Sequence, residues 1–350
     1  MTTIRVETAR PYEVQVGAGL LDQLGAQLRA RCNARRAVVV TDDHVAPLHG
    51  AAAVRSLQHG GFAVEKFIIP SGESSKCGEM YLKLLRFLAA HQVTRTDVLV
   101  ALGGGVVGDL TGFAAATYLR GVPFVQVPTT LLAAVDSSVG GKTAIDLPEG
   151  KNLVGTFYQP LLVLCDIDTL NTLPPEIFAD GCAEVIKYGI LGDAELFRTL
   201  EKTGIRFDRE SVIAACVRQK RDVVDADEFD TGARQLLNLG HTFAHGIESC
   251  SGYEVPHGRA VAIGMAMIAR AAAAKGYCTH DTAQRVASVL ERFGLPTETV
   301  YDASALATCA RRDKKRAGDS ITLIVPREIG RCDRVAVPVD ELGAWATAGR

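Results

Sequence analysis

The stretch Asn-Leu-Gly-His-Thr-Phe-Ala-His, at residues 238–245, contains two of the chain's eight histidines. His241 and His245 are four residues apart, so on an α-helix their imidazoles would project from one face, one turn apart. Imidazole is a common metal ligand and a common acid or base near neutral pH. The spacing alone leaves open whether both histidines bind a metal or one of them does something else.

A carboxylate and a third histidine extend this chemistry. Glu184 and Lys187 stand at i and i+3 in a segment with helical periodicity, where a surface salt bridge is the ordinary interpretation. His257 precedes another predicted helix, where a capping or surface role is the ordinary interpretation. Together, one carboxylate and two imidazoles from separate helices form the ligand set of an open, catalytic divalent-metal site. If His241 and His257 join Glu184, His245 is not needed as a ligand.

A glycine-rich turn indicates where a dinucleotide could bind. Gly103, Gly105 and Gly108 follow an apolar run and open a helical stretch, which matches the pattern G-x-G-x-x-G. Backbone N–H groups at such a helix start attract a diphosphate. The pattern also suits a tight strand-to-helix turn without a ligand, and at least two predicted strands precede it, unlike an ordinary Rossmann fingerprint. Asp42, at the end of an earlier strand, suits either a ribose or a helix N-cap.

A second glycine-rich segment carries cations. Residues 136–155 contain Lys142, Lys151 and Asn152 among several glycines, after a predicted strand. Two lysines and an amide can neutralise a phosphate, although a mobile surface loop with solvated lysines fits the same composition. We expect this segment to be a polar loop outside the core.

The elements that must position these groups change type along the chain. Short apolar runs at 36–43, 64–70, 97–105, 124–130 and 161–167 are mostly separated by helix-length segments such as 77–92 and 106–119, which predicts a mostly parallel, Rossmann-like α/β sheet. Helical periodicity then dominates at 176–190, 210–226, 236–250, 258–276, 281–293 and 303–312, with a hairpin pattern at 321–338. We expect an α/β domain over 1–172 and a mainly α-helical, metal-binding domain over 173–350, with the active site in the cleft between them.

The bulk composition excludes several classes of function. A net charge of −2 over 350 residues provides no basic surface for nucleic acid or membrane. The nine cysteines are scattered singly without a Cys-x-x-Cys pair, so neither a disulfide framework nor a thiolate zinc site is predicted. The N-terminus lacks an apolar signal core, and the longest apolar run, 260–274, is too short to span a bilayer. We expect a cytoplasmic protein that acts on a small molecule.

Several long motifs together resemble one enzyme family. The segments LGGGVVGDLTGFAAATYLRGVPFVQVPTTLLAAVDSSVGGKTAIDLPEGKNLVGTFYQP, CAEVIKYGIL, LLNLGHTFAHGIE and HGRAVAIGM look like those of 3-dehydroquinate synthase, and the similarity covers nearly the whole chain. The resemblance implies a usually dimeric enzyme of the shikimate pathway that uses catalytic NAD and a divalent metal, commonly zinc, with cobalt as an alternative. It implies that 3-deoxy-D-arabino-heptulosonate 7-phosphate is cyclised with loss of phosphate, through transient oxidation by NAD, elimination, re-reduction and aldol closure.

The resemblance also implies roles for individual residues. The metal ligands would be Glu184, His241 and His257. The NAD-binding residues would be Asp42, Glu73, Lys76, Gly104, Gly105, Asp109, Thr129, Thr130, Lys142 and Lys151. The catalytic and substrate-binding residues would be Asp136, Lys142, Asn152, Lys187, Lys220, Arg234, Asn238, His245 and Lys314, with Lys315 as the alternative to Lys314 and with Arg120 supplied across a homodimer interface. His245 would then face the substrate, and the metal would be held without it.

Two positions depart from the family pattern. Asp230 and Arg259 stand where the family usually has glutamate. The first change shortens a carboxylate by one methylene. The second reverses a charge two residues from His257, a change that bears on the surroundings of this ligand.

Three other functions remain as alternatives. A polyol dehydrogenase that releases NADH would share the glycine turn and the helical metal domain, but would not be expected to carry the segment 136–155. A related sugar-phosphate cyclase is closer: Arg234, Asn238 and His245 favour a carboxylated substrate over a cyclitol precursor, which leaves an aminodehydroquinate synthase in competition. A non-catalytic nucleotide-binding protein is disfavoured because the metal-ligand positions and the lysines are intact.

Overall fold

The computed structural model describes residues 1–310, 316–317 and 319–350. The chain divides into two compact units, one made of Met1–Pro174 and Arg209–Phe229, the other of Pro175–Asp208 and Asp230–Arg350. The sequence predicts a single break at 172–173. The segment Arg209–Phe229, which contains the helix α7 (Arg209–Ala226) and was expected in the second domain, belongs to the first unit in the structure.

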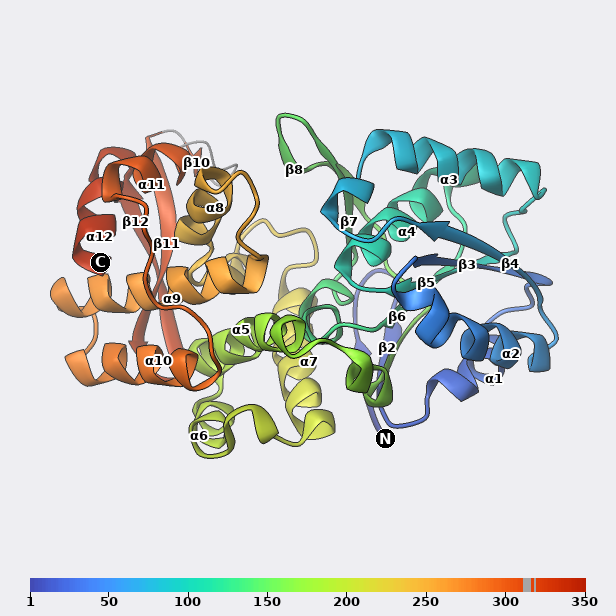
Figure 1. Cartoon of the computed structure of the whole chain (residues 1–350), viewed down its shortest axis with the longest axis horizontal. Helices are drawn as coiled ribbons and strands as arrows, with labels where there is room; N and C mark the ends of the chain where they lie inside the picture. Colours follow the sequence, from blue (N-terminus) through green and yellow to red (C-terminus); the bar gives the residue numbers. More distant parts are fainter. Residues whose placement is uncertain (311–315, 318) are drawn as a thin grey trace. The chain divides into compact units, whose positions relative to one another are not determined.

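The first unit is built on a seven-stranded sheet in the order β1-β2-β9-β6-β5-β3-β4 (Figure 1). β1 pairs antiparallel with β2, and the pairs that join the other strands are parallel, which confirms the mostly parallel sheet. The strands are β1 (Thr2–Val6), β2 (Tyr12–Gly17), β3 (Arg36–Asp42), β4 (Ala63–Ile69), β5 (Val98–Gly103), β6 (Phe124–Pro128) and β9 (Leu162–Asp166).

Helices cover both faces of this sheet. On one face, Val39 of β3 packs in a cluster with α1 (Leu24–Arg29) and α2 (Ala51–His59). On the other, Val38 packs in a cluster with α3 (Gly78–Ala90) and α4 (Gly105–Thr117). Figure 1 shows α1 and α2 on one side of the sheet and α3 and α4 on the other. Successive strand residues point to opposite faces, so a strand covered on both sides must be apolar throughout. This is why β3 and β5 appear in the sequence as unbroken apolar runs.

The segment 136–155 differs from the loop that the sequence predicts. After a short π-helical turn, η5 (Ala133–Ser137), it contains most of an antiparallel pair, β7 (Lys142–Leu147) and β8 (Gly150–Phe157). The Thr143 hydroxyl donates to the Thr156 carbonyl at 2.8 Å. A Cβ on Gly155 would lie 2.2 Å from the Thr143 carbonyl oxygen. Glycine here permits close strand pairing, so the composition that suggested a mobile loop belongs to a hairpin.

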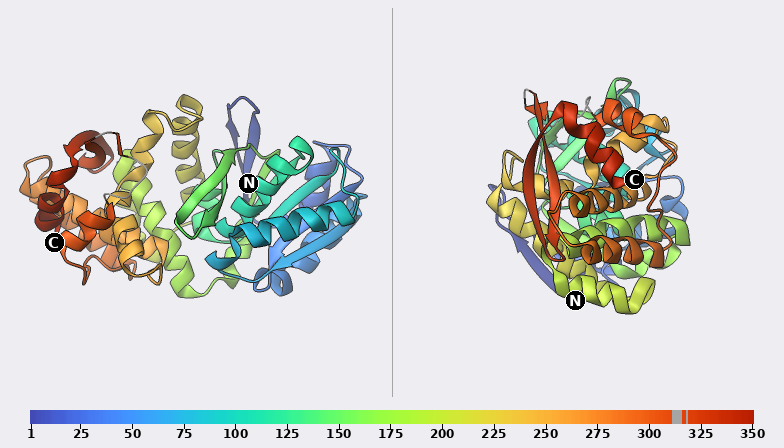
Figure 2. Two further views of the ribbon diagram at one scale, coloured as in Figure 1. Left: turned by 90° about the horizontal axis from the view of Figure 1, so that it is seen from above. Right: turned by 90° about the vertical axis from the view of Figure 1, so that its left-hand side faces the viewer.

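The second unit is mainly helical, as the sequence predicts, and it contains the expected hairpin. β11 (Ser320–Glu328) and β12 (Arg331–Pro338) pair antiparallel, with the short β10 (Arg316–Ala317) on β11, and Figure 2 shows the two long strands beside the helices. Its helices are α5 (Pro175–Gly192), α6 (Ala194–Thr203), α8 (His241–Cys250), α9 (His257–Ala274), α10 (His280–Arg292), α11 (Ala303–Ala310) and α12 (Leu342–Gly349). The first unit's α7 (Arg209–Ala226) packs against β1. Within the described residues, every helix is too short or too polar to cross a membrane.

The helix predicted over 236–250 is interrupted at Gly240. Residues Ala233–Asn238 form a 3₁₀ segment, η8, and α8 begins at His241, because Gly240 has a left-handed φ of 78°. A Cβ on Gly240 would lie 2.7 Å from the backbone nitrogen of Met265 in α9, and a Cβ on Gly264 would lie 2.1 Å from the Gly240 carbonyl oxygen. The two glycines therefore let the start of α8 lie directly against α9.

Gly240→Ala is expected to destabilise the second unit more than the matched change Gly276→Ala. Both glycines have positive φ, at 78° and 75°, so both substitutions incur the left-handed backbone penalty of about 1–2 kcal/mol. Gly276 has open space around its Cβ position, whereas Gly240 meets α9 and should lose a further ~1–3 kcal/mol through overpacking. Thermal unfolding of both variants without added metal measures the difference. Equal midpoints would contradict the proposed role of this close packing.

Candidate functional site

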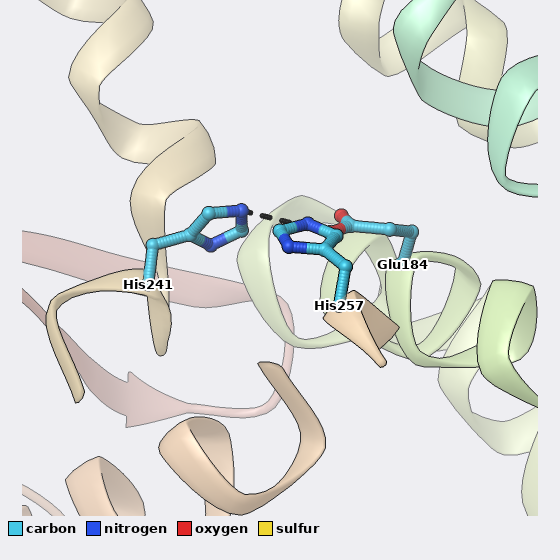
Figure 3. Close-up of side chains that lie close together, drawn as sticks. All are labelled: Glu184, His241 and His257. Carbon is cyan, nitrogen blue, oxygen red and sulfur yellow. Dashed lines mark ion pairs between the residues drawn. The ribbon is translucent and has the colours of Figure 1, made fainter. Parts of the chain in front are cut away.

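Three residues of the second unit converge from three helices. Glu184 comes from α5, His241 is the first residue of α8, and His257 is the first residue of α9. One ligand atom from each lies within 4.8 Å of the others, and Figure 3 shows the side chains pointing toward one another. Glu184 Oε1 is 3.6 Å from His241 Nε2 and 3.4 Å from His257 Nε2. These are the three residues that the resemblance implies as metal ligands.

The electrostatics of this cluster favour a cation. Burial is the largest single influence on His257 and lowers its pKa, but hydrogen bonds and charges from Glu184 and Glu248 outweigh it and raise the pKa to about 10. Glu184 is only 1% exposed, and a carboxylate removed from water needs compensating positive charge. Two imidazole nitrogens and a carboxylate oxygen also match the donor set of a catalytic zinc-type site, which keeps further coordination positions for other ligands. The residues present therefore fit a divalent metal.

Both imidazoles are oriented by their second ring nitrogen. His241 Nδ1 lies 3.0 Å from the Leu239 carbonyl oxygen, and His257 Nδ1 lies 3.3 Å from Glu248 Oε1. With Nδ1–H donated to these acceptors, Nε2 is the nitrogen of each ring that faces Glu184. The arrangement places a ligating nitrogen of each ring inside the cluster.

The start of α9 is fixed by α5. The backbone N–H of Arg259 donates to Asp180 Oδ1 at 2.8 Å, and a Cβ on Gly258 would lie 2.0 Å from the Asp180 carbonyl oxygen. Asp180 therefore caps the helix that begins with His257. The Arg259 side chain is exposed, so the charge reversal at this position does not place a cation among the three clustered side chains.

Two other residues implied for catalysis lie next to this cluster. Lys187, one turn after Glu184 on α5, has its Nζ 2.5 Å from Glu184 Oε2, and both side chains are 1% exposed. A surface salt bridge, the ordinary interpretation of this spacing, is therefore wrong. His245 lies one turn after His241 on α8, with ring centroids 5.7 Å apart, and it does not belong to the three-residue cluster.

In the first unit, five of the residues implied for NAD binding lie at or just after the carboxyl ends of β3, β5 and β6. Thr41 pairs with Leu102 and Gly103 with Pro128, so Asp42, the Gly104–Gly105 turn and Thr129–Thr130 follow neighbouring strands. A Cβ on Gly104 would lie 3.1 Å from Thr130 Cγ2, and one on Gly105 would lie 3.2 Å from Ser137 Oγ. The turn thus exposes backbone rather than side chains at the N-terminus of α4, which fits a diphosphate.

Asp42, for which the sequence left helix capping and ribose binding open, holds the turn that leads from β3 into the next helix. Its Oδ1 accepts hydrogen bonds from the backbone nitrogens of His44 at 3.0 Å and Val45 at 2.8 Å. The other carboxylate oxygen is not used in these two bonds.

Lys76 is the centre of a polar cluster in the first unit. Its Nζ lies 2.6 Å from Asp109 Oδ2 and 3.8 Å from Glu73 Oε1, and it donates to Asn152 Oδ1. Burial lowers the pKa of Lys76, but the neighbouring carboxylates outweigh this effect and raise it. Asp146 Oδ1 accepts from the Asn152 backbone N–H at 2.7 Å and so fixes the position of Asn152. The structure thus brings together four residues that the resemblance implies for cofactor or substrate binding.

The remaining implied residues occupy several places. Lys220 of α7 lies 2.9 Å from Asp136 Oδ1 and also donates to the Asp136 carbonyl oxygen, so these two residues are brought together. Arg234 is 2% exposed and lies in η8 together with Asn238. Lys142 is on β7 and Lys151 on β8. Arg120 is exposed and has a positive φ of 64°. Lys314 and its alternative, Lys315, lie outside the described residues.

Sequence reasoning missed three acidic residues that position site groups. Asp146 holds the Asn152 backbone, Asp180 caps α9, and Glu248 contacts His257. A signal existed for Glu248, because it follows His241 by seven residues, or two helical turns, and therefore shares its face of α8. The other two act through backbone groups, which residue spacing does not reveal.

Comparison with known proteins agrees with this geometry. The models of the 3-dehydroquinate synthase N-terminal and C-terminal domains match residues 66–180 and 181–316. The 3-dehydroquinate synthase of Caulobacter vibrioides is 47% identical over 337 residues, covering 92% of this chain and 91% of that protein. The enzyme of the same name from Enterococcus faecalis is 43% identical over 340 residues, covering 95% of each.

Solved structures show the same fold. The 2-epi-5-epi-valiolone synthase of Streptomyces hygroscopicus subsp. jinggangensis, solved with NAD⁺ and Zn²⁺ bound, aligns with a TM-score of 0.89 at 28% identity, covering 100% of this chain and 98% of that one. The two domain models together match more than half of the chain, and the identities to curated relatives extend over nearly all of it. The chain belongs to the 3-dehydroquinate synthase family.

Proposed function

We propose that this chain converts 3-deoxy-D-arabino-heptulosonate 7-phosphate into 3-dehydroquinate and phosphate, with NAD and one divalent metal as cofactors. The observation that carries the proposal is the convergence of Glu184, His241 and His257 in a chain of this family. The enzyme would act as a phosphate-eliminating lyase in the shikimate pathway. It would work in the cytoplasm as a homodimer, with Arg120 supplied to the partner's site.

The metal would be held by Glu184, His241 and His257. When bound, it would act as a Lewis acid that lowers the pKa of a substrate hydroxyl. Zinc is the ion that the donor set favours, with cobalt as an alternative, because imidazole and carboxylate ligands suit both. The zinc in the related valiolone synthase supports this choice.

Lys187 is suited to handle the proton of that hydroxyl. Its Nζ is 2.5 Å from Glu184 Oε2, and the pair is almost completely removed from water. A buried lysine held beside one metal ligand can accept a proton as the neutral amine and release it as the ammonium, with little solvent reorganisation. This contact with a proposed metal ligand, one helical turn away, supports Lys187 as the proton-transfer group.

The proposed substrate has two anionic groups, and the chain offers cations suited to each. The guanidinium of the buried Arg234 has the planar fork that matches a carboxylate, with Asn238 in the same short helix. His245 and the lysines at 142, 220 and 314 are assigned to phosphate and its protons, as compact or titratable cations. Asp136 and Asn152 would bind substrate hydroxyls and phosphate. Because the substrate's own phosphate can serve as the base for the elimination, few free carboxylates are needed for this step.

NAD would bind at the glycine turn of the first unit. When bound, it would oxidise a substrate alcohol to a ketone by accepting a hydride, and would return the hydride after phosphate has left. The ketone makes the neighbouring C–H bond acidic enough for phosphate to be eliminated. The Gly104–Gly105 backbone would hold the diphosphate, and Asp42 the ribose. The residues Glu73, Lys76, Asp109, Thr129, Thr130, Lys142 and Lys151 would complete the cofactor site.

His241→Ala and His245→Ala should separate metal binding from substrate handling. The two residues are one turn apart on α8, so they form a matched pair. His241→Ala should lose the metal, because two protein donors are too few for an open site. His245→Ala should retain one metal per chain and lose turnover by roughly 10²- to 10⁴-fold. Elemental analysis and phosphate release measure the two effects; equal loss of metal in both variants would reject the assignment.

NAD should be required in catalytic amount and should not be consumed. Phosphate release should continue for many turnovers when NAD is far below the substrate concentration, because the hydride returns to the product. The absorbance of NADH should stay flat while phosphate accumulates. Accumulation of NADH in step with product would instead identify a polyol-type dehydrogenase.

A further inference from the structure

Glu248 is a buried carboxylate whose contact with His257 has no part in the mechanism above. It is 4% exposed and lies on α8, two turns after His241. Its Oε1 is 3.3 Å from His257 Nδ1, on the side of the ring opposite to Glu184. The helix α8 therefore supplies His241 to the cluster at its first residue and, through Glu248 near its end, a contact to His257.

His257 needs such a contact more than His241 does. His257 is the first residue of α9, and its side chain is 35% exposed, against 12% for His241. His241 Nδ1 is already held by the Leu239 carbonyl oxygen, which is fixed to the chain two residues away. A partly exposed imidazole at a helix start can rotate and present either nitrogen unless one nitrogen is occupied.

We infer that Glu248 is a positioning residue, which accepts the Nδ1–H of His257 and thereby directs Nε2 toward Glu184 and the metal. The inference rests on the proposed role of His257 as a ligand. In metal sites, a carboxylate on the far nitrogen of an imidazole fixes its tautomer and orientation and increases its basicity. Glu248 therefore determines how well His257 can bind the metal without touching metal or substrate itself.

The test compares Glu248→Gln and Glu248→Ala with the matched control Glu254→Gln. Glu254 is exposed in the turn between α8 and α9, so its substitution removes the same charge without touching His257. Glutamine keeps an oxygen that can accept the Nδ1–H, whereas alanine leaves none. Metal affinity, measured by competition with a chromophoric chelator, should fall by about 10- to 100-fold in Glu248→Ala and less in Glu248→Gln. The control should bind like the wild type.

The absorption spectrum of the Co²⁺-substituted protein provides a second readout, because its d–d bands report the ligand geometry. Both Glu248 variants should change these bands, with the larger change for alanine, while Glu254→Gln keeps the wild-type spectrum. Wild-type affinity and spectrum in both Glu248 variants would overturn the inference. If the wild type itself failed to bind one metal per chain, both the inference about Glu248 and the proposed function would be rejected.

A second observation concerns two sulfur atoms away from the metal ligands. Cys250 is the last residue of α8, and its Sγ is 3.1 Å from Sγ of Cys309 in α11. Both residues are partly exposed. The helices pack closely here, since a Cβ on Gly246 would lie 3.2 Å from the Leu306 carbonyl oxygen. The sulfur atoms thus meet because the backbones of α8 and α11 hold them together.

We propose that Cys250 and Cys309 form a reversible disulfide by exchange with a low-molecular-weight disulfide. The Cys309 sulfur attacks the small disulfide, releases one thiol and forms a mixed disulfide; Cys250 then attacks Cys309 Sγ and releases the second thiol. Two protein thiols are oxidised and one small disulfide is reduced to two thiols. Burial and the contact with Cys309 raise the pKa of Cys250 to about 11, so Cys250 is mostly protonated near neutral pH and is not the thiol that reacts first. The second step depends instead on the short distance between the two sulfur atoms.

Incubation with oxidised glutathione tests this order of reaction. The wild type should lose two hydrogen masses, and a non-reducing digest should contain a peptide pair linked through Cys250 and Cys309. Cys250→Ser should stop at one glutathione on Cys309, because no second thiol is present. Persistent glutathione on Cys309 in the wild type, or no reaction at either cysteine, would overturn the proposal.

Discussion

The buried carboxylate of Glu184 is the constraint on which the second unit depends. A carboxylate at 1% exposure has lost its hydration, a cost of several kcal/mol that only nearby positive charge or hydrogen-bond donors can offset. Lys187 and the two imidazoles surround it within 3.6 Å. Two helices, α8 and α9, must therefore begin at the point where α5 passes. A divalent ion bound there would satisfy the same requirement, which links the packing of this unit to the proposed chemistry.

Glycine makes that convergence possible. Gly240 and Gly264 let α8 approach α9, and Gly258 lets the start of α9 approach the Asp180 backbone of α5. At each position a Cβ would come within 2.7 Å of a neighbouring backbone atom. Because both histidines begin their helices, small displacements of these helix starts would move the ligand atoms directly. The glycines of the histidine motifs thus hold the site geometry through the backbone.

Much of the fold was predictable because its signals are local. The central strands β3 and β5 are apolar on both faces, and the helices have clear periodicity. The pair β7–β8 was missed because its glycines and lysines resemble a loop, and the break at Gly240 was missed because helical periodicity continues across it. The placement of Arg209–Phe229 in the first unit depends on tertiary packing, which no local pattern encodes.

The three clustered side chains were identified through the family motifs, whereas the residues that orient them were not. Glu184, His241 and His257 have residue types that suggest metal binding. Glu248 and Asp180 are ordinary acidic residues of helices, and their roles follow only from distances. Spacing on α5 predicted the contact of Glu184 with Lys187, but it could not predict that the pair is buried.

The central claim is that the three converging side chains form the metal site, and a crystal structure of the zinc-loaded protein with an anomalous difference map tests it most directly. We expect one zinc peak per chain, at about 2.0–2.2 Å from Nε2 of His241, Nε2 of His257 and a carboxylate oxygen of Glu184. His245 should lie outside the coordination sphere. Zinc bound by His245 in place of His257, or bound elsewhere in the chain, would contradict the assignment.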